Sequence, residues 1–151
     1  GQIIVRGSSP GDSQVFLEGI PLPQLYHFGG LTSVINSRLL ESIDFYPGNF
    51  SSRYGRKMGG IIEVGTRDAR RDGIHGVAEL SVIDVSLLAE FPIGRNAAGA
   101  FSVRRSTIDF VFENIVPDDI GVVAAPVYYD YQGFVTWRPT DRDRVRIMSY
   151  G

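Results

Sequence analysis

A period-two alternation in VYYDYQGFVTWR, residues 127–138, constrains the fold more than any other feature. One parity is apolar with aromatic residues at its ends, and the other is mostly polar, as in a strand that separates two different environments. A second alternation covers residues 83–93, but the apolar residues Ala78, Leu80 and Val82 before it occupy the opposite parity. We therefore predict two strands, 75–82 and 83–93, separated by a bulge or a tight turn.

Strands of about ten residues with one apolar and one polar face suit a transmembrane β-barrel, in which all backbone groups pair between strands. A soluble β-sandwich also has alternating strands, so the alternation alone favours neither architecture. About five strands are expected here, which is too few to close a barrel. The barrel interpretation therefore requires further strands elsewhere in a longer protein.

Residues 1–67 have a different pattern of short apolar runs broken by glycine and proline. We predict strands at 2–6, 14–19, 43–48 and 60–66, a loop over IPLPQLYHFGGL, and one helix within residues 33–42. Together these elements form a small α+β unit. The segment DARRDG, residues 68–73, separates this unit from the alternating strands.

Composition excludes several classes of protein. The net charge is -2 with 21% charged residues, so net charge gives no electrostatic attraction to nucleic acid. Cysteine is absent, which rules out disulfides and thiolate metal sites. The longest apolar runs fall short of the roughly 20 residues of a membrane-spanning helix. The chain opens within a strand pattern and without a leader, so we expect it to be a piece of a longer protein.

The order of motifs in the first 67 residues resembles the second half of the plug domain of TonB-dependent outer-membrane receptors. The family pattern has an arginine-glycine strand, a strand ending in an acidic residue and glycine, a proline-bearing loop, a short helix, an isoleucine-rich strand, tyrosine-glycine, a double glycine and a strand ending in Thr-Arg. The chain departs from it at Glu18, where the family usually has Asp. Here the matching positions are Arg6-Gly7, Glu18-Gly19, 37–42, 43–48, Tyr54-Gly55, Gly59-Gly60 and Thr66-Arg67.

This resemblance implies a mostly β fold, in which a small α+β plug sheet is followed by antiparallel transmembrane strands of a barrel of about 22 strands. The implied domains are the C-terminal half of the plug at 1–67, a plug–barrel linker at 68–74 and the first barrel strands at 75–151. The later strands match the family more loosely. The N-terminal half of the plug and the TonB-contacting segment are expected outside this sequence.

The resemblance further implies a receptor in the Gram-negative outer membrane that binds a scarce solute, such as a siderophore, cobalamin or glycan, and imports it. Its partners would be the rest of the barrel, the TonB–ExbB–ExbD complex, outer-membrane lipid and the solute, with no nucleic acid and no cofactor. The alternative is a plugged barrel that carries no solute and serves as a structural or signalling subunit of an outer-membrane complex. A soluble β-sandwich binding module remains a third possibility.

Charged plug residues are candidates for contact with the barrel. Arginine pairs well with carboxylates, and Arg6 and Arg53 lie near glycines that permit close approach of the backbone. The family implies such arginine–carboxylate contacts, against the alternative of solvated surface arginines. We predict plug–barrel contacts for Arg6, Arg53, Arg67 and Glu18, and structural turns at Gly7, Gly19, Tyr54, Gly55, Gly59 and Gly60.

The aromatic loop residues Tyr26, His27 and Phe28 are candidates for ligand contact or for packing on the barrel. A metal site is disfavoured because His75 is the only other histidine and there is no cysteine. No enzyme is predicted. GSSPGDS has no base in a fixed relation to its serines. YGRKMGG is followed by a strand, whereas a phosphate-binding loop is followed by a helix.

Overall fold

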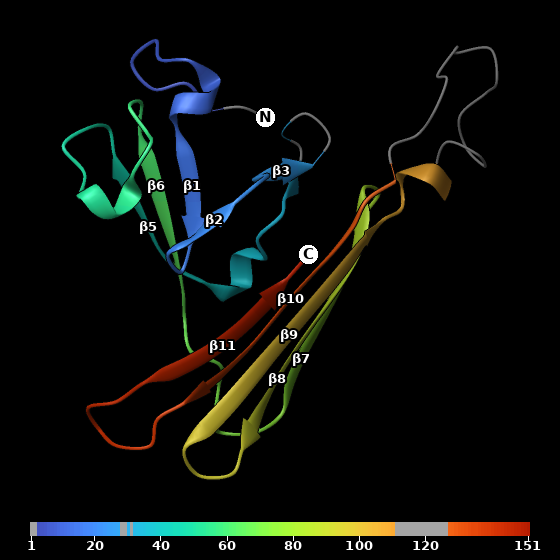
Figure 1. Cartoon of the computed structure of the whole chain (residues 1–151). Helices are drawn as coiled ribbons and strands as arrows, with labels where there is room; N and C mark the ends of the chain where they lie inside the picture. Colours follow the sequence, from blue (N-terminus) through green and yellow to red (C-terminus); the bar gives the residue numbers. More distant parts are fainter. Residues whose placement is uncertain (1–2, 28–29, 31, 111–126) are drawn as a thin grey trace. The chain divides into compact units, whose positions relative to one another are not determined.

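The computed structural model describes residues 3–27, 30, 32–110 and 127–151, which divide into two compact units, Gly1–Arg67 and Asp68–Gly151. Strands dominate both units (Figure 1). Among the described residues, no helix has the length and apolar character needed to cross a bilayer. The predicted mostly β fold is confirmed.

The first unit contains a four-stranded sheet in the order β2-β1-β6-β5, which we call the plug sheet. Strand β1 is parallel to β6, while β2 and β5 run antiparallel to their neighbours. Phe16, Tyr54 and Ile61 form a buried cluster against which Phe50 packs. The strands are β1 (Gln14–Leu17), β2 (Ile20–Leu22), β5 (Leu40–Tyr46) and β6 (Ile61–Thr66), with a separate pair β3 (Tyr26–His27) and β4 (Thr32–Ser33) and 3-10 turns η1 (Pro10–Asp12), η3 (Ser37–Leu39) and η4 (Ser52–Tyr54).

Three local predictions for this unit are wrong. The helix expected within residues 33–42 is only the 3-10 turn η3, because Leu40 already pairs with Thr66 at the start of β5. Residues 3–6 form no strand, since Arg6 and Gly7 have φ of 51° and 74° and make a tight turn closed by the Ser8 N–H on the Val5 carbonyl. The proline-bearing loop contains β2 and β3.

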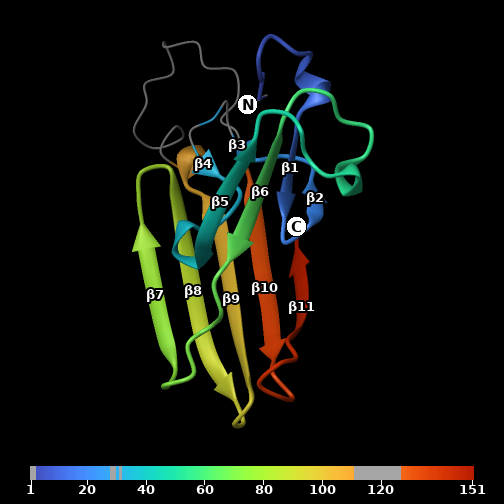
Figure 2. The same ribbon diagram turned by 90° about the vertical axis from the view of Figure 1, so that its left-hand side faces the viewer.

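The second unit contains a five-stranded antiparallel meander in the order β11-β10-β9-β8-β7, which we call the wall sheet. Figure 2 shows its strands side by side with alternating direction. Three of them have the nine or ten residues that a tilted barrel strand needs to span a bilayer. The strands are β7 (His75–Leu80), β8 (Asp84–Ile93), β9 (Ala97–Ser106), β10 (Tyr129–Trp137) and β11 (Val145–Tyr150).

The parity change between Val82 and Ile83 is a tight turn. The Ser81 N–H donates to the Asp84 carbonyl, and β7 pairs with β8 from Leu80 opposite Val85 onward. The two strands predicted from the change of parity are confirmed: their outer ends, at residues 75 and 93, agree with the prediction, and only the ends next to the turn are shorter, by two residues in β7 and one in β8.

The two faces of the wall sheet differ in chemistry. One, the apolar face, exposes large hydrophobic side chains, and the other, the polar face, carries charged and hydroxyl groups. On the apolar face, Phe91 lies over Gly99 and Phe101 lies over Gly133. A Cβ on Gly99 would stand 2.9 Å from the Phe91 ring, and one on Gly133 would stand 3.2 Å from the Phe101 ring. The apolar face includes Leu87, Phe101, Val103, Tyr131, Val135, Trp137 and Ile147, and the polar face Glu90, Ser102, Arg104, Asp130, Gln132, Thr136 and Arg146.

Candidate functional site

The Glu18-Gly19 pair makes the two-residue turn between β1 and β2. Both residues have positive φ, 52° and 79°, which fits a type I′ hairpin turn and explains the glycine. The Glu18 carboxylate accepts hydrogen bonds from the backbone N–H and the hydroxyl of Thr66, at 2.7 Å and 2.6 Å. The structure thus places Glu18 at the C-terminal end of β6, where it fixes the last residue of that strand.

Arg53 belongs to a chain of polar contacts across the plug sheet. Its guanidinium stacks on the Tyr54 ring and donates to the Tyr54 hydroxyl. Burial raises the pKa of Tyr54, so the hydroxyl keeps its proton and donates to Glu63 at 3.0 Å. The second Glu63 oxygen accepts the Gly19 N–H at 2.6 Å. Glu63, which the sequence did not single out, therefore connects η4 to the β1–β2 turn.

The double glycine is required by close packing. A Cβ on Gly59 would lie 2.5 Å from the Ser8 hydroxyl oxygen, and one on Gly60 would lie 2.7 Å from a Val5 methyl carbon. Both glycines are buried. They let residues 5–13 lie directly against the start of β6.

Arg67 and His27, two further residues predicted as contacts, lie in different parts of this unit. Arg67 donates from Nε to the Arg38 carbonyl at 2.8 Å, which ties the end of β6 to η3. His27 lies in β3, with its Nδ1 3.5 Å from the Gln24 amide nitrogen. Phe28 lies outside the described residues. Among the residues that the structure describes, no group of three metal-ligating side chains comes together.

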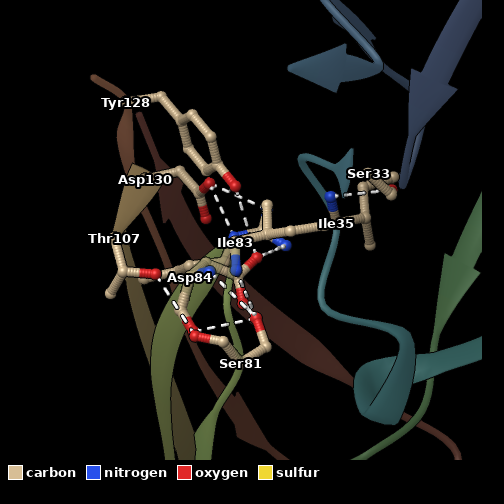
Figure 3. A network of polar contacts seen from close by, with 9 residues as sticks. Ser33, Ile35, Ser81, Ile83, Asp84, Thr107, Tyr128 and Asp130 are labelled. Carbon is tan, nitrogen blue, oxygen red and sulfur yellow. Dashed lines mark hydrogen bonds and ion pairs between the residues drawn. The ribbon is translucent and has the colours of Figure 1, made fainter. Parts of the chain in front are cut away.

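A charged network spans β8, β9 and β10 on the polar face. Arg104 donates to Asp130 from Nη2 at 2.8 Å and from Nε at 3.1 Å, and its Nη1 lies 3.9 Å from Asp84. The Tyr128 hydroxyl also reaches Asp84, at 3.4 Å. Figure 3 shows Tyr128 and Asp130 directing their polar ends toward the turn that carries Ser81 and Asp84.

The tight turn before β8 supports this network. The Ser81 hydroxyl donates to the Asp84 carboxylate at 3.1 Å and accepts the Asp84 N–H at 2.9 Å, while Thr107 donates to the Val82 carbonyl at 3.0 Å (Figure 3). Asp84 is thereby fixed before it meets Arg104. The network lies at the end of the sheet where residues 107–128 connect β9 to β10.

A second charged cluster lies at the other end of the sheet, where β10 ends and β11 begins. It centres on Asp68. Its Oδ2 accepts from Arg138 Nη2 at 2.6 Å, and its Oδ1 accepts from Arg144 Nη2 at 2.9 Å and from Arg146 Nη2 at 2.6 Å. Burial acts to raise the pKa of Asp68, but the three arginines outweigh it and lower that pKa to about 2. We call Asp68, Arg138, Arg144 and Arg146 the Asp68 cluster.

Sequence reasoning missed the acidic members of both clusters. In the sequence, Asp68 is part of the separating segment DARRDG, and Asp84 and Asp130 belong to the polar parity of the alternating strands, which gives none of them a particular role. One signal was available: Arg142, Arg144 and Arg146 alternate in DRDRVRI, which gathers three guanidinium groups in a short stretch that needs an acidic partner. Their acidic partner lies more than 70 residues away, and local spacing cannot reveal it.

Comparison with known proteins identifies the first unit. Residues 1–61 match the family described as TonB-dependent Receptor Plug Domain. The match covers 61 of the 151 residues. The resemblance to TonB-dependent receptors seen in the sequence is confirmed, and the family is one of receptors and transporters, not of enzymes.

Solved structures extend the likeness in fold beyond the plug domain. A double mutant of the ferric enterobactin receptor PfeA from Pseudomonas aeruginosa aligns with 99% of this chain, at a TM-score of 0.59 and 18% identity. A PfeA mutant in complex with enterobactin aligns with 97% of it, at 0.58 and 18%. The chain covers 26% of each receptor. No curated protein matches the chain significantly.

Proposed function

We propose that the chain is part of an outer-membrane receptor that binds a scarce solute and imports it by energy-driven remodelling of its plug. The observation that carries this proposal is the combination, in one chain, of a plug-family unit with a sheet that has an apolar face and a charged face. An apolar outer face suits lipid, and a polar inner face suits a lumen through which a hydrophilic solute passes.

The plug unit is built in a way that suits remodelling. Its turns and strand ends are held by polar contacts such as those of Glu18 with Thr66 and of Tyr54 with Glu63. A hydrogen bond that can be exchanged for water contributes only about 1 kcal/mol net. A unit of this kind opens at modest cost compared with the long strand pairs of the wall sheet.

We infer the orientation in the membrane from one long connection, that between β9 and β10, although the β7–β8 turn at the same end of the sheet is short. Outer-membrane barrels have long extracellular loops and short periplasmic turns. Residues 107–128 would then be extracellular, and the turns 94–96 and 138–144 periplasmic. This orientation places the Arg104 network toward the cell exterior and the Asp68 cluster toward the periplasm.

The partners follow from the same proposal. The solute would be a siderophore, cobalamin, glycan or similar molecule, and TonB with ExbB and ExbD would supply the energy. The candidate contacts to the rest of the barrel are Arg6, Arg53, Arg67 and Glu18, and the candidate ligand-facing residues are Tyr26, His27 and Phe28. Residues 68–74 would be the linker between plug and barrel.

Solute uptake by intact cells tests the proposal. A strain in which the gene is deleted should lose accumulation of one labelled solute from a panel of ferric siderophores, cobalamin and glycans, and a plasmid copy should restore it only in cells with TonB. Unchanged uptake of every solute, together with loss of an envelope complex, would instead favour a structural or signalling subunit.

A further inference from the structure

The segment that follows the plug unit is attached to the wall sheet at several points. Asp68 binds one arginine at the end of β10, one in the β10–β11 turn and one in β11. Two residues later, the Arg70 N–H donates to Glu90 in β8 at 3.1 Å. Residues 68–70 therefore have partners in β8 and β11, at the end of β10 and in the β10–β11 turn.

The attachment contains one arginine that is much less exposed than in an ordinary surface ion pair, while Arg138 and Arg144 are 40% and 38% exposed. Arg146 is held before it meets Asp68, because its Nε donates to Thr136 at 2.9 Å and its guanidinium stacks 4.5 Å from the centre of the Phe134 ring. Its side chain is only 9% exposed. Glu90 and Ala69 are each 4% exposed. Isolated exposed pairs contribute little, whereas several charges held in one network contribute more.

Charge balance makes Asp68 the critical member. One carboxylate faces three guanidinium groups, so the cluster carries a net charge of about +2 when Asp68 is ionised. Removing the carboxylate would leave three like charges close together without their common acceptor, and like charges repel. The arginines would then separate, and the segment would lose its attachment at this end.

We propose that Asp68 is a positioning residue that keeps residues 68–70 on the wall sheet while the plug moves. The inference rests on the proposed function, because it presupposes a plug that changes conformation. It adds that the moving part ends at Arg67, and that the segment after it stays with the barrel. Plug displacement would then leave the periplasmic end of the wall sheet unchanged.

Spin labels in the full-length receptor test this inference. The sequence has no cysteine, so single cysteines can be introduced for labelling at exposed Arg71, next to the attached segment, and at exposed Met58 in the plug unit. Label mobility is followed by EPR during a urea titration of purified receptor. At exposed positions a label reports backbone motion, and we call it immobile while its spectrum keeps the restricted motion of an ordered segment. In the otherwise unchanged protein, the label at position 58 should become more mobile at low urea, while the label at 71 keeps its restricted motion until the barrel unfolds.

The Asp68→Asn substitution should remove this difference. The label at 71 should become mobile before any urea is added, and Asp68→Glu should restore much of the immobile fraction because it keeps a carboxylate. Asp141→Asn is the matched control, since it removes one exposed carboxylate from the same β10–β11 turn and should leave the spectrum unchanged. Heat-dependent gel mobility reports whether the barrel itself is folded.

If Asp68→Asn receptor does not fold, Arg144→Gln removes one of the three arginine contacts and should give a partial increase in mobility. An immobile label at 71 in Asp68→Asn, or in Arg144→Gln when that variant has to be used, would overturn the proposal, as would simultaneous release of both labels in the unchanged protein. These measurements need neither TonB nor solute. Failure of uptake in cells would therefore count against the proposed function without affecting this result.

Discussion

Arg146 Nη2 lies 2.6 Å from Asp68 Oδ1, although 78 positions separate the two residues. Arg138 and Arg144 bind the same carboxylate from the preceding strand end and turn. The contact joins the segment after the plug unit to the far edge of the wall sheet. Its acid sensitivity can be predicted from the pKa of Asp68.

Acid should release the Asp68 cluster only at very low pH. The pKa of Asp68 is lowered from 3.8 to about 2, so the cluster contributes fully above about pH 4, and its contribution, up to roughly 2 kcal/mol, is lost as the pH falls through 2. A spin label at position 71 should stay immobile at pH 4 and gain mobility between pH 3 and 2. Release already at pH 5 would contradict the assignment, and Asp68→Asn should show no such transition.

Adding a methyl group at Gly60 should destabilise the plug unit. A Cβ there would overlap a Val5 methyl group at 2.7 Å, and overpacking of this kind typically costs about 1–3 kcal/mol. Gly60→Ala should therefore lower the urea midpoint reported by a label at position 58. Gly11→Ala is the control, because nothing lies within 4 Å of its Cβ position.

The same site allows a double-mutant test. Val5→Ala removes the methyl groups that Gly60→Ala would meet, so the double variant should lose less stability than the sum of the two single variants. Strict additivity would mean that the two residues do not touch in the folded receptor.

A charge on the apolar face should impair the barrel. Leu87 is 54% exposed on that face, and arginine on the lipid side of an outer-membrane barrel costs about 2–4 kcal/mol near the bilayer centre. Leu87→Arg should reduce the folded fraction in equilibrium unfolding from lipid vesicles, while Leu87→Val should fold nearly as well as the original protein. Equal stability of both variants would mean that this face does not contact lipid.

Loss of Arg53 should loosen the plug and raise leakage through the barrel. Arg53 supports the Tyr54 hydroxyl, which donates to Glu63, and Glu63 in turn holds the β1–β2 turn. Arg53→Ala should make cells more sensitive to large antibiotics, and Tyr54→Phe should act in the same direction. Arg95→Ala, in the exposed β8–β9 turn, is the control. Unchanged sensitivity at normal expression would contradict the prediction.

The wall strands could be predicted from sequence because their two faces meet different surroundings. Alternation located β8 and β10, and the parity change after Val82 located the turn between β7 and β8. Each of these features is encoded in a short stretch of chain, where side-chain period alone distinguishes one face from the other.

The elements of the plug unit are harder to predict from sequence, because pairing between distant strands overrides the local preference for helix or strand. Leu39 and Leu40 suggested a helix, but Leu39 is buried in η3 and Leu40 pairs with Thr66 across β5 and β6. Arg6 ends no strand because its positive φ belongs to a turn. Glu63 and Asp68 gained their roles from partners distant in sequence, which no local pattern records.

The two phenylalanine–glycine pairs of the wall sheet have a consequence for assembly. A shift of β10 by two residues against β9 would keep every side chain on its own face, so the apolar pattern alone does not forbid it. It would, however, place Tyr131 or Val135 opposite Phe101, where Gly133 now leaves room for the ring. Phe91 opposite Gly99 imposes the same restriction on β8 and β9. The two glycines thus favour the observed strand register over one shifted by two residues, which the apolar pattern alone would allow.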